Sequence, residues 1–187
     1  MLAGVPFGDR LPHPEARAAF LAWRRARRQA GGRTPLLGGF APHDLPRSAM
    51  PRTFVYEMKS DGDLLCVLAG EEVTFLFGYS PKGKTLREMV PGALGDERAA
   101  QVHQAIRTGL PFWMEGRVLI DGRTHVVMGR LVVPVRRGDP PSDGALILYV
   151  RLDDFDGPML PASAPVKFAA DPLIWCTPAD LEDRESR

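Results

Sequence analysis

The stretch Phe75–Val90, FLFGYSPKGKTLREMV, decides the fold. Its apolar start ends at Gly78, and both Gly78 and Gly83 can adopt positive φ without a steric penalty. Pro81 between them blocks helix continuation and biases the residue before it towards extended geometry. The stretch therefore predicts two short helices at an angle to each other, one before Gly78 and one after Gly83.

Strand-like and helical segments surround this connector. An unbroken apolar run in the strand before it indicates cover on both faces, and Asp121-Gly122 is a strong signal for a two-residue hairpin. Two strands, a helical connector and a closing meander predict an α+β fold, with a five-stranded antiparallel sheet and the helices on one face. The expected elements are strands over Thr53–Met58 and Leu64–Ala69, helices over Glu71–Phe77, Thr85–Val90 and Asp96–Thr108, and strands over Phe112–Ile120, Thr124–Val135 and Ala145–Leu152.

This order of elements, together with the connector, resembles the PAS domain family. The residues that match the family's connector motif are Gly78, Tyr79, Ser80, Pro81, Gly83, Leu86, Glu88, Met89, Val90 and Pro91. The similarity spans about Thr53 to Leu152 and is greatest to standalone bacterial PAS-like proteins with an N-terminal helix. The chain departs from the family at Ala69-Gly70-Glu71, where an Asn is common. The resemblance implies a PAS-like sensory domain that performs no catalysis, binds a small ligand or a protein partner, and signals through protein–protein interaction.

The residues before and after this domain are expected to form separate segments. Residues 1–52 would hold an N-terminal amphipathic helix over Pro14–Gln29, with Phe20 and Trp23 on its apolar face. That face would pack on the sheet of its own domain or on a second copy, and we expect a homodimer in which Phe20 and Trp23 are the interface anchors. Residues 53–152 would be the sensory domain and 153–187 a Pro-rich tail, whose apolar Pro172–Cys176 could dock on the domain or on a partner.

Composition narrows the setting and the partners. With 44% hydrophobic and 25% charged residues, the chain suits one globular domain with appendages. A formal net charge of +1 gives no reason to expect nucleic acid as a partner. No apolar run approaches the length of a membrane span. The distant Cys66 and Cys176 predict free thiols in a reducing bacterial cytoplasm.

The resemblance implies a ligand space between the helices and the inner face of the sheet. A plain hydrophobic core would need the same residue types, so both interpretations stay open. The candidate pocket residues are Phe77, Met89, Val102, His103, Ile106, Met114, Val118, Val127, Gly129, Leu131 and Leu148.

Few residues offer chemistry beyond binding. The sequence contains no Gly-rich phosphate loop, no His-Glu-x-x-His and no Gly-x-Ser-x-Gly motif, so no catalytic residue and no metal ligand is assigned. His103, on the apolar face of its helix, allows three alternatives. It could be a core histidine whose ring nitrogen meets a backbone carbonyl or a ligand. It could ligate haem, as the resemblance to haem-binding PAS sensors implies, or it could serve a small α+β isomerase or lyase as an acid or base, with Glu88 and Glu115 as further candidates.

Overall fold

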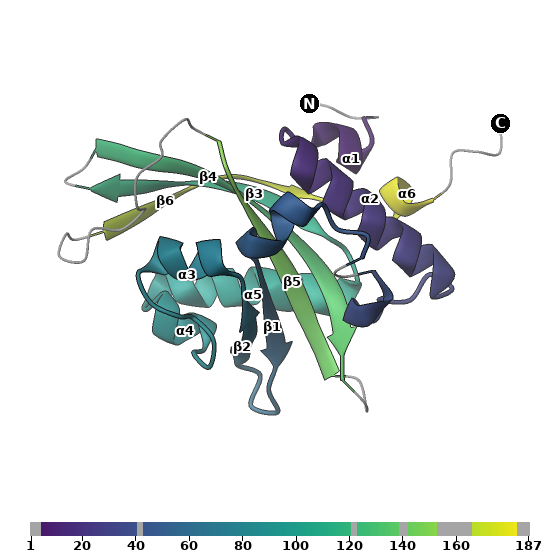
Figure 1. Cartoon of the computed structure of the whole chain (residues 1–187), viewed down its shortest axis with the longest axis horizontal. Coiled ribbons are helices and arrows are strands. Elements are labelled where there is room, and N and C mark those ends of the chain that lie inside the picture. Colours follow the sequence, from purple (N-terminus) through teal and green to yellow (C-terminus); the bar gives the residue numbers. More distant parts are fainter. Residues whose placement is uncertain (1–4, 41–42, 121–122, 139–141, 153–165, 183–187) are drawn as a thin grey trace.

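The computed structural model describes residues 5–40, 43–120, 123–138, 142–152 and 166–182, with side chains for all of these except 118–120, 123–126 and 166–172. An antiparallel sheet of six strands, in the order β2-β1-β5-β4-β3-β6, forms the centre of the molecule (Figure 1). The strands are β1 Thr53–Met58, β2 Leu64–Ala69, β3 Phe112–Ile120, β4 Arg123–Arg137, β5 Ser142–Arg151 and β6 Val166–Trp175. The helices are α1 Phe7–Arg10, α2 Pro14–Gln29, α3 Glu71–Phe77, α4 Leu86–Met89, α5 Ala93–Thr108 and α6 Pro178–Leu181, with the 3-10 turns η1 Leu37–Gly39 and η2 Arg47–Arg52. The predicted α+β, PAS-like antiparallel fold is confirmed, with one more strand than expected.

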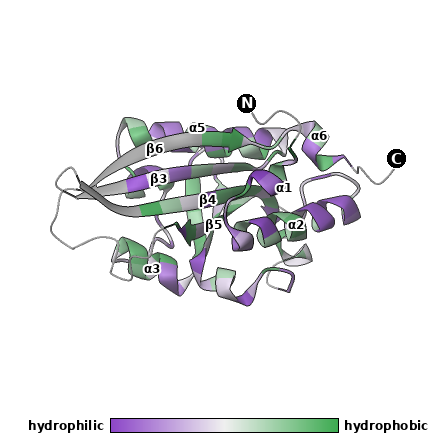
Figure 2. Ribbon diagram, turned by 90° about the horizontal axis from the view of Figure 1, so that it is seen from above, coloured by the Kyte–Doolittle hydropathy of each residue, from purple (hydrophilic) through white to green (hydrophobic). Residues whose placement is uncertain are grey.

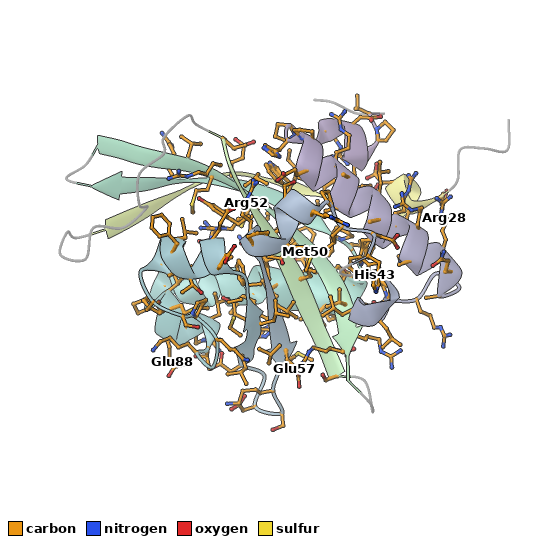
Figure 3. The ribbon with its side chains drawn as sticks, in the orientation of Figure 1. Arg28, His43, Met50, Arg52, Glu57 and Glu88 are labelled. Carbon is orange, nitrogen blue, oxygen red and sulfur yellow. The ribbon has the colours of Figure 1, made fainter. Side chains whose placement is uncertain are left out.

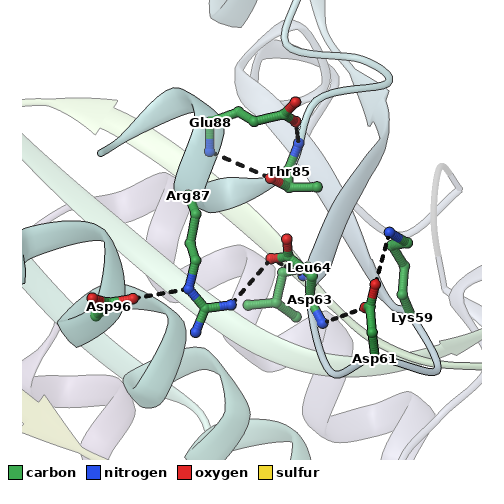
Figure 4. A network of polar contacts seen from close by, with 8 residues as sticks. All are labelled: Lys59, Asp61, Asp63, Leu64, Thr85, Arg87, Glu88 and Asp96. Atoms are coloured by element: carbon green, nitrogen blue, oxygen red, sulfur yellow. Dashed lines mark hydrogen bonds and ion pairs between the residues drawn. The ribbon is translucent and has the colours of Figure 1, made fainter. Parts of the chain in front are cut away.

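The connector between β2 and α5 folds as its glycines and capping residues predict. Gly78 ends α3 in the left-handed conformation with φ 70°, and Gly83 has φ 85°. Thr85 and Glu88 then form a reciprocal capping box, in which the Glu88 carboxylate accepts from the Thr85 amide at 2.6 Å and the Thr85 hydroxyl accepts from the Glu88 amide at 3.3 Å (Figure 4). The box starts α4 immediately after the turn.

Polar contacts tie this connector to its neighbours. Arg87 on α4 donates to Asp96 at the start of α5 at 2.8 Å and to Asp63 in the β1–β2 turn at 3.4 Å (Figure 4). The amide of Gly83 donates to the Cys66 carbonyl, and the Cys66 amide donates to the Lys84 carbonyl. The connector thus covers part of the outer edge of β2, which would otherwise expose unpaired backbone groups.

The two faces of the sheet are covered by different helices. α3, α4 and α5 pack on one face over a core that includes Phe112, Ile147 and Val132. α1 and α2 pack on the other face, over Trp113, Leu131 and other residues. Figure 1 shows these two groups of helices lying apart from each other. None of the helices in the described ranges is both long and apolar enough to cross a membrane.

The N-terminal helix α2 packs on the sheet of its own chain. His13 caps it, Pro14 occupies its first turn, and polar and apolar residues alternate along it (Figure 2). Phe20 and Trp23 are 1% and 0% exposed, and the Trp23 indole N–H donates to the Pro134 carbonyl at 2.7 Å. Both side chains are buried inside the monomer, so they are not available as the anchors of a dimer interface.

One ionic contact joins the helices on the two faces. Arg52, at the end of η2 and labelled in Figure 3, pairs with Glu15 of α2 at 2.9 Å and with Glu72 of α3 at 3.1 Å. The start of α3 also lies very close to η2, because a Cβ on Gly70 would collide with the backbone carbonyls of Pro51 and Met50. The first turn of α3 is therefore held against η2, and through Arg52 against α2.

Part of the segment predicted as a tail belongs to the sheet. β6 pairs antiparallel with β3, and the Trp175 ring contacts the Phe112 ring with centroids 4.8 Å apart. Beyond it, Asp180 at α6 pairs with Arg10 of α1 at 2.9 Å, which joins the two ends of the described chain. The Pro-rich residues 153–165 lie outside the described residues.

Candidate functional site

A cavity of about 70 Å³ lies between the sheet and the helices α3, α4 and α5. Since about 10–15 Å³ of such space suffices for one water molecule, the cavity has room for several water-sized groups or a small organic molecule. Strands β1, β3, β4 and β5 form its floor, and the connector and α5 form its roof. The lining residues are Phe54, Tyr56, Phe77, Leu86, Val90, Leu94, Arg98, Gln101, Val102, Phe112, Met114, Arg130, Val132 and Ile147.

Arg98 on α5 brings a positive charge to this mostly apolar lining. The residue is 8% exposed, and burial lowers its pKa below the ordinary arginine value. Its guanidinium donates to the Gln101 side-chain oxygen at 3.2 Å and lies 3.1 Å from the Met114 sulfur. The Gln101 amide in turn donates to Glu97 at 3.0 Å. Gln101 therefore fixes the position of Arg98 without neutralising it.

Arg130 on β4 brings a second positive charge. It pairs in the sheet with Met114, the residue that Arg98 contacts, so the two arginines approach the cavity from opposite layers. Arg130 is partly exposed, and burial, followed by the neighbouring charge of Arg98, lowers its pKa to about 10. Across the described residues, neither guanidinium forms an ion pair with a carboxylate.

Tyr56 on β1 adds a neutral donor. It is 2% exposed, and burial raises its pKa well above the ordinary tyrosine value, so the phenol keeps its proton at neutral pH. Its hydroxyl forms no hydrogen bond with any of the residues that the structure describes, whereas a buried tyrosine hydroxyl usually has a partner. The cavity therefore combines an apolar wall with two cationic groups and one phenol, and Asp, Glu and His are absent from its described lining.

The predicted pocket residues fall into three groups. Phe77, Val102 and Met114 line the cavity. Met89 and Ile106 belong to the same apolar layer but lie behind the lining. The third group lies on the opposite face of the sheet, beneath α2, and comprises Gly129, Leu131 and Leu148. Val127 belongs to this group because it precedes Gly129 by two residues on β4, and side chains two residues apart on a strand share a face. The side chain of Val118 lies outside the described ones.

A β-bulge explains the third group. A regular hairpin closed by Asp121-Gly122 would pair Met114 with Gly129, which puts Met114, Gly129 and Leu131 on one face. The observed register shifts by one residue between Val118 and Leu119, so Met114 pairs with Arg130 and Trp113 pairs with Leu131. The bulge turns Arg130 and Val132 to the cavity and Gly129 and Leu131 away from it.

Gly129 has a role on that opposite face. A Cβ at this position would overlap the indole ring of Trp113, which is fully buried. The absence of a side chain therefore makes room for Trp113 beneath α2 and not for a ligand.

His103 does not line the cavity. It is partly buried on α5, and its Nε2 atom has no hydrogen-bond partner among the described residues. A cavity with room for several water-sized groups is far too small for a porphyrin, so the residues present do not fit haem. Glu88 is committed to the capping box, and Glu115 accepts from the Trp113 indole at 3.2 Å. None of the three acid–base candidates reaches the cavity.

The two cysteines are free and buried. Burial raises the pKa of Cys66 to about 11 and that of Cys176 to about 12, so both stay protonated as inert thiols at neutral pH. Neither lines the cavity.

Sequence reasoning missed the polar groups of the site. Arg98 precedes Val102 by four residues, so the helical period places the two on the same face of α5, and a charged residue on that face was the available signal. Arg130 gave no such signal, because the pattern of polar and apolar residues along β4 does not reveal the bulge that turns Arg130 towards the cavity. Tyr56 is a common strand residue whose unpaired hydroxyl appears only in three dimensions.

Comparison with known proteins assigns the architecture. A family model described as PAS domain matches residues 11–146, which include α2, strands β1 to β4 and the first half of β5. No curated protein and no solved structure matches the chain.

Proposed function

The chain belongs to the PAS domain family, and we propose that it is a sensory module whose cavity binds a small ligand and whose ligand state is read by a partner protein. PAS domains generally act as sensory modules and not as catalysts. The observation that carries the proposal is the cavity between the sheet and α3, α4 and α5, which has an apolar lining and a few buried polar groups, as small-molecule sites usually do. The lack of a carboxylate or imidazole in its described lining favours binding over acid–base catalysis.

The connector is the part of the roof best suited to respond to a ligand. Phe77, Leu86 and Val90 line the cavity, while α4 has only four residues, of which two are buried, and its polar contacts to Asp96 and Asp63 are exposed. Segments with few buried contacts open at low free-energy cost. A ligand that binds better to one arrangement of this roof shifts the population towards that arrangement, by no more than its difference in affinity.

A route from this roof to the N-terminal helix runs through Arg52. The first turn of α3 is packed against η2, and Arg52 bridges Glu72 on α3 and Glu15 on α2. Movement of α3 would therefore strain or release a contact on the other face of the sheet. In this proposal the signal leaves as a change in the packing of α2, and a partner protein or a second copy of the chain detects it.

Native mass spectrometry of the freshly purified chain tests the proposal. We expect a species heavier than the 20.6 kDa chain by the mass of a small molecule. Val102→Phe, which fills the cavity from α5, should lose that species. Ile106→Phe, one helical turn further along and outside the lining, should keep it. The proposal would be contradicted if the chain carried no bound compound and if no molecule in a broad panel of small organic compounds changed its melting temperature.

A further inference from the structure

Three hydrogen-bond donors line the cavity, and no carboxylate in its described lining matches them. Arg98 is 8% exposed and Tyr56 is 2% exposed, and both line the space together with Arg130. Arg98 and Arg130 come from opposite layers and meet at Met114, which the first contacts and the second pairs with in the sheet. The donors therefore surround one end of the cavity, and the remaining lining is mostly apolar.

Charge makes this arrangement unusual. A buried guanidinium normally has a carboxylate partner, because an uncompensated charge is costly away from water. The described residues provide no such partner for Arg98 or Arg130, although other arginines of the chain have theirs, as Arg10, Arg52 and Arg87 show. The only side-chain oxygen that Arg98 contacts belongs to the neutral Gln101. The described lining therefore supplies no anion, and the nearby Glu97 carboxylate raises the Arg98 pKa by less than burial lowers it.

We propose that the cavity binds a small organic carboxylate, whose charged head lies between Arg98 and Arg130 and whose apolar body, a short alkyl chain or a single ring, contacts Phe112, Val132 and Ile147. The inference rests on the proposed function, since it names the ligand class of the same site. The planar guanidinium matches the two oxygens of a carboxylate. The neutral Tyr56 hydroxyl supplies one more donor.

The apolar lining argues for an organic anion over an inorganic one. Inorganic phosphate would meet the donors but would leave the walls formed by Phe112, Val132 and Ile147 without a contact. Burying apolar ligand surface against these walls contributes about 25 cal/mol per Å². An alkyl or aryl carboxylate uses both parts of the site.

The experiment compares each acid with its amide, which has the same shape and no charge. The dialysed full-length chain is titrated with hexanoate and hexanamide, with benzoate and benzamide, and with inorganic phosphate, by calorimetry and by thermal melting. We expect at least one acid to bind at least tenfold more tightly than its amide and than phosphate. Arg98→Met and Arg130→Met should each weaken that acid at least tenfold, while Arg107→Met, on the exposed side of α5, should not. Arg98→Lys and Arg130→Lys, which keep the charge, should recover part of the affinity, and circular dichroism checks that every variant is folded.

The outcomes separate this inference from the proposed function. Equal binding of acid and amide, or binding of the acid that neither arginine substitution weakens, would overturn the carboxylate assignment. The proposal of a ligand-binding sensory module would still stand. Phosphate binding as tight as that of the acids would overturn the role of the apolar body. A neutral compound found by native mass spectrometry, with no acid binding, would overturn the inference alone. If no compound binds and none is carried through purification, the proposed function fails as well.

Discussion

Replacing Arg130 by methionine should stabilise the ligand-free protein. Most substitutions inside a fold destabilise it, but this one removes a partly buried charge that has no carboxylate partner in the described structure. Methionine is unbranched and flexible, so it can follow the path of the arginine side chain through the apolar layer. The direction of the effect separates an uncompensated charge from an ordinary structural arginine.

The magnitude follows from the lowered pKa. The lowering of the Arg130 pKa from its ordinary value to about 10 means that folding disfavours the charged form by roughly 3 kcal/mol at neutral pH. Part of the residue reaches the surface, where solvent screens the charge, so we expect about 1–3 kcal/mol. For a chain of 187 residues this amounts to a rise in melting temperature of about 2–12 °C.

The assay is thermal and urea unfolding of the dialysed wild type, Arg130→Met and the control Arg107→Met. Arg107 is exposed, so its variant should stay within about 0.5 kcal/mol of the wild type. With a binding carboxylate at 100 times its dissociation constant, the wild type should gain about 2.7 kcal/mol and Arg130→Met almost nothing. The difference in stability between Arg130→Met and the wild type would then shrink or change sign.

Two results would refute this reasoning. A ligand-free Arg130→Met that is less stable than the wild type by 1 kcal/mol or more would mean that the guanidinium has stabilising partners, which leaves no charge for a ligand to neutralise. A stability gain from the carboxylate that is equal in wild type and variant would mean that the anion binds elsewhere.

Three further substitutions test the packing that positions the site. Gly129→Ala should lower the free energy of unfolding by about 1–3 kcal/mol in urea, because its methyl group would displace the buried Trp113 ring. The control Gly38→Ala, which has open space around it, should be close to neutral. A neutral Gly129→Ala would contradict the assigned register. Trp23→Phe should lower the free energy of unfolding by about 1–3 kcal/mol, because it removes the hydrogen bond to the Pro134 carbonyl. Light scattering should show an unchanged oligomeric state. A changed oligomeric state in the folded variant would mean that Trp23 takes part in an interface between chains. Truncation after Leu152 removes β6 and should lower the melting temperature and promote aggregation through the exposed edge of β3, and an equally stable, monodisperse fragment would show that β6 is dispensable.

The connector and the regular elements could be predicted because local rules determine them. Gly78 and Gly83 take the positive φ values that glycine tolerates, and α2 starts and ends where its proline and its apolar period indicate. The strand pairs of the meander follow from alternation and from the hairpin signal. Each of these features depends on residues close to one another in the sequence.

The features that could not be predicted depend on register and long-range pairing. β6 contains Asp171-Pro172, which argues against a strand, yet the register with β3 shifts by one residue here, between the pairs Met114–Leu173 and Gly116–Ala170. An edge strand tolerates a proline at such a bulge. The bulge at Val118 and Leu119 had the larger effect, since one extra residue exchanged the two faces of β4. Of the predicted pocket residues, Phe77, Val102 and Met114 therefore line the cavity, whereas Gly129, Leu131 and Leu148 lie on the opposite face of the sheet.

Solution NMR of methyl groups tests whether a ligand binds in the cavity between the sheet and helices α3, α4 and α5. The neighbouring residues Val132 and Val133 lie on opposite faces of the same strand, the first on the cavity and the second beneath α2. On titration with hexanoate we predict intermolecular nuclear Overhauser effects to the methyl groups of Val132, Val102 and Ile147, and none to Val133 or Leu148. Contacts to Val133 and Leu148, or to surface methyl groups only, would contradict the account.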